Sequence, residues 1–170
     1  RMMVATIDDG TAAMEVMLYS EVYEPNRSWL KEDELVIAKV NVTPDKFSGG
    51  TRIVAEAVMD IAGARLRFGR NVHVRMDSAI DLKLFRSQIN PYLISNRQQH
   101  AKPGMPPNLA PSPLDGIKGL PLTAVVTASG SACLVQFPDE LRLYPDDACL
   151  HSLHQLLAST QTDPVVVQYA

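Results

Sequence analysis

The sequence predicts an all-β unit followed by a small α+β unit. Short strand-like runs fill most of residues 1–60, whereas strand-like and helical runs alternate over residues 71–170. An Arg-rich stretch at 61–70 connects the two regions. A chain of 170 residues can hold one domain of ordinary size or two small ones. We therefore expect two units, 1–60 and 71–170, joined by a connector.

The first unit opens with two strands. The apolar run Met2–Ile7 is followed by Asp8-Asp9-Gly10, a sequence typical of a hairpin turn. Residues Ala13–Tyr19 then alternate between two sets with the period of a half-buried strand. Met14, Val16 and Leu18 form one set. Glu15, Met17 and Tyr19 form the other.

A helix and two more strands complete the first unit. Ser20–Asp33 is amphipathic, and Pro25 within it predicts a late helix start or a kink. Leu35–Val42 and Thr51–Met59 are predicted strands on either side of a loop. The order strand, strand, helix, strand, strand is that of a five-stranded OB barrel without its first strand. Since an open edge invites pairing with another chain, we expect an edge-strand dimer or a disordered barrel in isolation.

The second unit mixes helices and strands. We predict a strand at Val72–Met76 and a helix at Asp81–Ile94. A hairpin of Leu122–Ala128 and Cys133–Phe137 follows, and Leu141–Tyr144 extends it. A helix from Asp146 or Asp147 to Ser159 and a strand at Val165–Val167 complete the unit. Residues 96–119 contain five prolines and three glycines and are predicted to be a flexible loop. The order predicts a small α+β sandwich of split βαβ type.

The charge of the chain is unevenly distributed. Its net charge is −3, but residues 1–60 carry six Lys and Arg against eleven Asp and Glu. Residues 61–119 carry nine Lys and Arg against three Asp and Glu, and residues 120–170 carry one basic residue against five acidic ones. The chain thus has a basic middle between two acidic regions, and a nucleic-acid contact has to be explained in terms of this distribution.

The remaining composition excludes several classes. No apolar run approaches the roughly 18 residues that a membrane span requires. No charged-then-apolar leader precedes the first strand, so we expect no signal peptide. Two cysteines, Cys133 and Cys149, are too few for a disulfide framework and fit a reducing cytosol.

The loop between the last two strands of the barrel is the first candidate binding site. It carries Lys46 and Phe47 beside two glycines, and Arg52 opens the following strand. An OB barrel binds nucleic acid through its second and third strands and its loops, where a cation meets phosphate and a ring stacks on a base. The alternative is that Phe47 packs under its own barrel and Lys46 is only solvated. Because the region is acidic, any binding should be weak, salt-sensitive and indifferent to sequence.

The connector supplies a second candidate. Arg65, Arg67, Arg70 and Arg75 lie within eleven residues and could line a track for a phosphate backbone, with Arg65 and Arg67 nearest the barrel. The alternative for such an Arg run is a solvated helix face. Elsewhere Cys149, His151 and His154 lie close together, but no further pair stands at metal-ligand spacing. Nothing in the sequence has the pattern of a catalytic centre, and we expect no catalytic residue and no metal.

Several segments resemble one family. Arg1–Asp9 and Ala13–Tyr19 look like the second and third OB strands of the catalytic alpha subunit of bacterial DNA polymerase III. The strongest match is Asp45–Gly50, followed by Ala55–Ile61 and Ala64-Arg65, which resembles the loop, last strand and exit of that barrel. Residues 70–170 are similar in the order of their elements.

This resemblance implies a fragment of a replicative polymerase of the bacterial cytoplasm. The parent would use magnesium-bound aspartates in a palm domain that is absent here, so the fragment itself would need no cofactor. The OB unit would contact single-stranded DNA through Lys46, Phe47 and Arg52, with Arg65 and Arg67 as an extension. The 71–170 unit would dock the tau subunit of the clamp loader, and the remaining domains of the alpha subunit would be further partners.

Three alternatives belong to other classes. One is an OB anticodon-binding module of a tRNA synthetase, although residues 70–170 lack class II signature arginines. Another is an interaction domain without nucleic-acid contact. A third is a small enzyme that uses Cys149 and His151.

Overall fold

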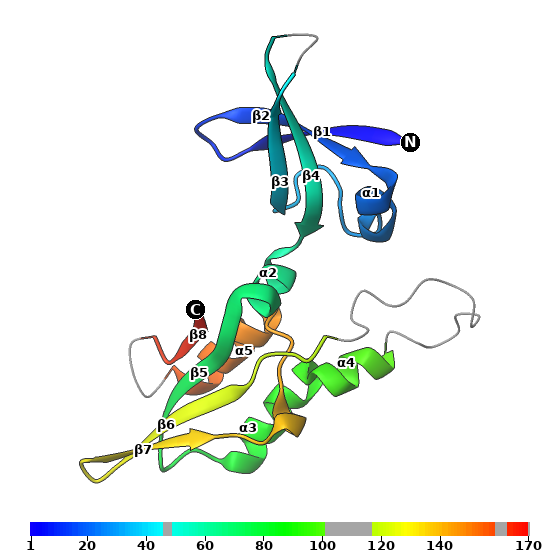
Figure 1. Ribbon diagram of the computed structural model, residues 1–170. Helices are drawn as coiled ribbons and strands as arrows, with labels where there is room; N and C mark the ends of the chain where they lie inside the picture. Colours follow the sequence, from blue (N-terminus) through cyan, green and yellow to red (C-terminus); the bar gives the residue numbers. More distant parts are fainter. Residues whose placement is uncertain (46–48, 101–116, 159–162, 170) are drawn as a thin grey trace. The chain divides into compact units, whose positions relative to one another are not determined.

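The computed structural model describes residues 1–45, 49–100, 117–158 and 163–169. The chain forms two compact units, Arg1–Ile61 and Ala62–Ala170 (Figure 1). Each contains one four-stranded sheet. Among the described residues, no helix is both long and apolar enough to cross a membrane.

The first unit is an open sheet of β1 (Met2–Asp8), β2 (Ala13–Tyr19), β3 (Ile37–Pro44) and β4 (Thr51–Met59). The order is β1-β2-β4-β3, with β2 and β4 parallel and the other pairs antiparallel. This is a partial OB arrangement with no closed barrel, so the predicted fold class is confirmed. β1 and β3 are its two edges.

The β1–β2 turn shows why this hairpin forms. Gly10 takes a positive φ of 81°, and Asp9 accepts hydrogen bonds from the backbone N–H groups of Thr11 and Ala12 and from the Thr11 hydroxyl. Led by the Thr11 hydroxyl, these bonds lower the pKa of Asp9 to about 2. The turn residues thus fix a register in which Met2 faces Tyr19.

One helix joins the two halves of the first sheet. α1 spans Ser20–Asn26, so the predicted late start is wrong. The helix ends one residue after Pro25, because proline lacks the N–H that would continue the hydrogen-bond ladder. The small buried core of this unit comprises Val16, Leu18, Ala55 and Val58.

α2 (Ile61–Phe68) starts at the last residue of the first unit and leads directly into β5 (Gly69–Asp77) of the second. The sheet of the second unit adds β6 (Leu122–Ala128), β7 (Ser131–Gln136) and β8 (Val165–Tyr169) in the order β7-β6-β5-β8. The predicted split βαβ type is wrong. β5 and β6 pair directly in parallel, with no strand inserted between them.

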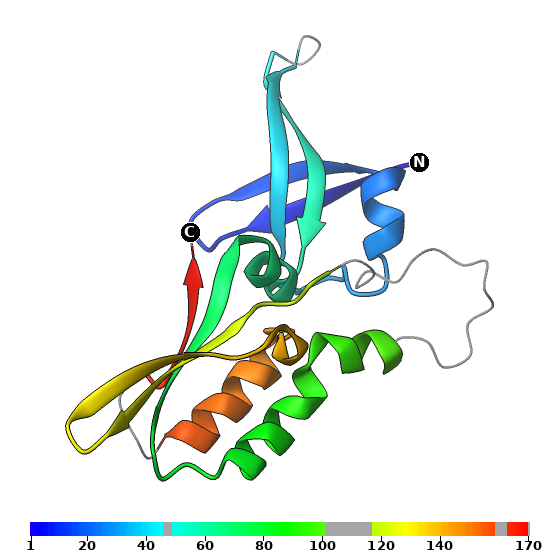
Figure 2. The ribbon, with the colours of Figure 1, turned by 60° about the horizontal axis from the view of Figure 1, so that its bottom comes forward.

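The helices α3 (Leu82–Ile89) and α5 (Asp147–Leu157) lie on one face of this sheet (Figure 2). Asp81 and Asp146 cap them by accepting backbone N–H bonds from the first turns. The core between helices and sheet is buried and apolar; it includes Val72, Val74, Met76, Phe85, Ile89, Leu122, Leu153 and Leu157.

Three predicted elements differ from the observed ones. The helix expected at 81–94 is divided into α3, a 3-10 turn at Asn90–Tyr92 and α4 (Ile94–His100), because Pro91 cannot continue α3. Residues 96–100 belong to α4 and not to a loop, whereas 101–116 lie outside the described residues. The strand expected at 141–144 is a 3-10 turn at Asp139–Leu141 followed by single bridges of Leu143 to Leu93 and Leu120.

Candidate nucleic-acid interface

The outer face of β1 and β2 is the surface that an OB unit offers to nucleic acid. Along β1, Met3, Ala5 and Ile7 are half-buried and pack toward the core, so Met2, Val4 and Thr6 are exposed on the other side. Cross-strand pairing places Met2 opposite Tyr19. The outer face therefore carries Met2, Val4 and Thr6, with the ring of Tyr19 at one end and the exposed carboxylate of Glu15 opposite Thr6.

Tyr19 and Arg52 meet at that end. Arg52 is the second residue of β4, and its guanidinium donates a hydrogen bond of 2.6 Å to the Tyr19 hydroxyl. Both side chains are exposed, and they come from neighbouring parallel strands. A ring and a cation held side by side are the elements of a base-stacking and phosphate-binding site.

The β3–β4 loop starts and ends next to this pair. The N–H of Asp45 donates to the Gly50 carbonyl at 2.8 Å, and the N–H of Gly49 donates back to the Asp45 carbonyl at 3.0 Å. These bonds close the loop two residues before Arg52. Lys46 and Phe47, the sequence candidates within it, lie outside the described residues.

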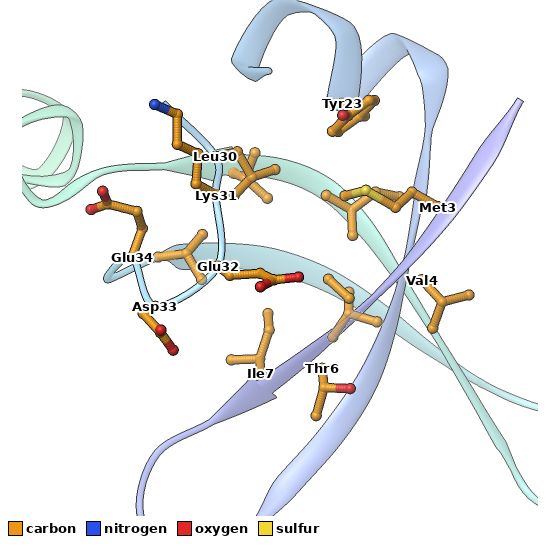
Figure 3. A pocket seen from close by; sticks show the side chains of 15 residues that line it. Met3, Val4, Thr6, Ile7, Tyr23, Leu30, Lys31, Glu32, Asp33 and Glu34 are labelled. Carbon is orange, nitrogen blue, oxygen red and sulfur yellow. The ribbon is translucent and has the colours of Figure 1, made fainter. Parts of the chain in front are cut away.

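The opposite, concave side of the sheet has a different character. A cavity of about 580 Å³ lies between β1 and the segment 30–36 (Figure 3). Its apolar lining includes Met3, Ile7 and Leu30, and its rim carries Glu32, Asp33 and Glu34 against a single Lys31. Because carboxylates repel phosphates, the concave side is unfavourable for nucleic acid, which leaves the outer face as the candidate.

Arg65 and Arg67 belong to α2 in the other unit. Arg65 donates to the Pro145 carbonyl at 3.1 Å and pairs with Asp147 at 2.6 Å, and its side chain is only 16% exposed. It therefore ties α2 to the start of α5. Arg67 is exposed, and its guanidinium carbon lies 5.9 Å from the centroid of the Phe68 ring. Of the two, Arg67 is the one available to a ligand.

Cys149 and His151, the pair that a small enzyme would use, lie in different surroundings on α5, one buried and the other exposed. Burial, followed by the charge of Asp146, raises the pKa of Cys149 to about 12. The His151 ring shares a hydrogen bond of 2.8 Å with Gln155 on the helix surface. Within the described ranges, no group of three or more His, Cys, Asp or Glu side chains is placed to hold a metal ion.

Sequence reasoning missed Tyr19 as a site residue. The signal was present in the alternation of β2, which assigns Tyr19 to the outward set, but its partner Arg52 is 33 positions away. No local pattern predicts that contact. It depends on the parallel pairing of β2 with β4.

No protein-family model matches the chain. Curated relatives do match it over nearly its whole length. The DNA polymerase III subunit alpha of Vibrio cholerae is 29% identical over 164 residues, which is 96% of this chain and 12% of that protein. The subunit alpha of Escherichia coli K12 is 24% identical over 96% of the chain, and that of Pseudomonas aeruginosa is 26% identical over 90%.

These matches confirm the resemblance to the DNA polymerase III alpha subunit. The chain spans about an eighth of the length of the relatives it matches. Its size and coverage are those of a fragment of that subunit.

Proposed function

We propose that this chain is a non-catalytic, C-terminal fragment of a replicative DNA polymerase III alpha subunit in the bacterial cytoplasm. Its first unit binds single-stranded DNA, and its second unit docks the tau subunit of the clamp loader. The remaining domains of the alpha subunit are its other partners. The homology over 96% of the chain supports the assignment to the polymerase. The Tyr19–Arg52 pair is the observation that carries the DNA-binding role.

The DNA contact extends from the outer face of β1 and β2 to the β3–β4 loop. Tyr19 stacks on a base, while Arg52 and Lys46 neutralise phosphates and Phe47 adds a second ring. Residues 1–60 carry a net charge of −5, from six basic and eleven acidic side chains, so this contact is weak. It is also indifferent to sequence, because stacking and phosphate contacts do not distinguish bases.

The salt dependence of binding to oligo-dT tests this role. The double variant Lys46→Ala/Arg52→Ala should lower the affinity and reduce the slope of log affinity against log salt by about 1.4, the value for two phosphate contacts on a single strand. Lys31→Ala is the matched control, since it removes a cation from the acidic rim of the cavity. An unchanged slope in the double variant would count against the assignment.

The docking surface for tau is the helix-free face of the second sheet. The buried set of β5 is Val72, Val74 and Met76, so His73 and Arg75 project from the other face. On that face Leu134 of β7 is 70% exposed and Val166 of β8 is 44% exposed. Apolar side chains of this size on an open sheet face favour a protein partner.

A substitution on each side of the second unit tests the docking. Leu134→Lys should weaken the complex with tau roughly tenfold or more, as measured by calorimetry, because a charge then enters an apolar contact. Leu82→Lys is the control, since Leu82 is 63% exposed at the start of α3. Equal effects of the two variants would overturn the choice of face.

The same measurements separate the alternatives. An interaction domain without nucleic-acid contact would bind tau but not oligo-dT at low salt. An anticodon-binding module would prefer tRNA to oligo-dT.

A further inference from the structure

The junction of α2 and β5 exposes side chains that neither proposed surface uses. Phe68, the last residue of α2, is 52% exposed. Arg67 and Arg70 on either side of it are also exposed. Residues 61–70 contain three arginines and no acidic residue. Phe68 is thus an exposed aromatic ring flanked in sequence by two exposed cations, in a segment that has no acidic side chain.

The backbone holds Phe68 at this position. A side chain at Gly69 would collide with the Arg65 carbonyl oxygen and would approach Leu120 to 2.8 Å. The chain can therefore turn directly from α2 into β5 only with glycine here. Phe68 ends the helix just outside the core of the second unit.

Phe68 forms a small cluster with Arg67, and a further exposed ring lies on the adjacent strand. The Arg67 guanidinium lies over the Phe68 ring at 5.9 Å from its centroid, within cation–π range. Gly69 faces Tyr169 across the β5–β8 pair, and Tyr169 is 55% exposed. The register shifts between Gly69 and Asn71, which leaves Arg70 without a cross-strand partner in β8.

We propose that Phe68, with Arg67 and Arg70, is a second binding site for single-stranded DNA, located on the second unit. One base stacks on the face of Phe68 that Arg67 leaves open, and the two arginines contact the adjoining phosphates. The inference rests on the proposed function for its ligand and on the sequence prediction for Arg67, whereas the role of Phe68 and a separate site on the second unit go beyond both.

Oligo-dT binding to the 170-residue chain, followed by fluorescence anisotropy at low salt, tests the proposal. Phe68→Leu keeps an apolar side chain but removes the ring, and it should lower the affinity roughly tenfold with an unchanged salt slope. Phe68→Tyr keeps the ring and should bind like the unmodified chain. Arg67→Gln/Arg70→Gln should lower the affinity and reduce the salt slope by about 1.4.

The outcomes distinguish this inference from the proposed function. Full affinity of Phe68→Leu, together with a loss in Lys46→Ala/Arg52→Ala, overturns the second site and leaves the first. A loss only in Phe68→Leu supports the second site and contradicts the first. If Phe68→Leu weakens the complex with tau but not with oligo-dT, the cluster is a protein contact and the inference is wrong. Unchanged thermal unfolding of each variant confirms that the fold is intact.

Discussion

At the scale of single residues, the two cysteines lie in contrasting surroundings. Cys133 is exposed on the edge strand β7, whereas Cys149 is fully buried in α5 against the core. Burial, with Asp146 nearby, raises the pKa of Cys149 to about 12. Because the thiolate is the reactive form, Cys149 is essentially unreactive at neutral pH. This argues against the alternative of an enzyme that uses Cys149 and His151.

The thiols should therefore react in two classes. A disulfide reagent such as DTNB at pH 8 should modify one thiol per chain rapidly and the second only after unfolding in denaturant. Cys133→Ser should remove the rapid phase. Rapid modification of two thiols in the folded chain would contradict the burial of Cys149.

Residue identities predicted caps and turns better than contacts. Asp146 was one of two expected caps of α5, and the Asp8-Asp9-Gly10 turn forms where its sequence indicates. Both depend on neighbours within three positions. In contrast, the charge of Arg65 predicts a phosphate contact, whereas its pairing with Asp147, 82 positions away, depends on the fold.

At the scale of elements, strand periodicity predicted β2 and β4 with the observed bounds. Two of the errors arise at prolines. Pro25 and Pro91 stop helices that an amphipathic pattern alone would continue. The helix α4 was missed because its sequence is polar. It is held by Arg97, whose guanidinium stacks on Tyr144 at 4.9 Å and pairs with Asp146 at 2.6 Å.

The edges of the first sheet lead to a prediction about association. Five consecutive residues of β1, Met3–Ile7, line the cavity (Figure 3). Because side chains alternate along a strand, this means that the backbone of β1 borders the cavity together with its inward side chains. Val4 and Val42, on the two edge strands, are 49% and 58% exposed. An exposed apolar edge favours pairing with another strand.

Sedimentation should therefore show concentration-dependent dimers of the chain. Val4→Lys should shift the equilibrium toward monomer, because a charged edge resists strand pairing. Leu82→Lys, which adds the same charge on a helix, should not. A strict monomer with full amide protection over Met2–Ile7 would contradict this prediction.

At the scale of the whole molecule, the sequence predicted the order of elements in both halves of the chain, but not how the second sheet is arranged. The expected split βαβ type required a strand between β5 and β6, yet these pair directly from Val72 to Asp77. Strand order depends on long-range pairing, which hydrophobic periodicity does not predict. For the same reason, the sequence does not predict that Tyr19 lies beside Arg52 on the outer face.

The distribution of charge also acquires a structural meaning. The acidic side chains of the first unit include Glu32, Asp33 and Glu34, which gather at the rim of the concave cavity and not on the outer face of β1. The outer face still carries Glu15 of β2, opposite Thr6, so its Tyr19–Arg52 end is the part most favourable to a phosphate backbone. The basic region starts at α2, where Arg65 forms an ion pair with Asp147 and Arg67 is exposed.

Mapping of the DNA contact by NMR tests the central claim most directly. On titration of the 170-residue chain with oligo-dT, we predict amide shifts in Met2–Thr6, Met17–Tyr19 and Thr51–Val54, and little change in the acidic segment 30–36. These shifts should weaken as salt is raised, since phosphate contacts are screened. Shifts confined to the segment 30–36, or none in the first unit at saturating oligo-dT, would contradict the account.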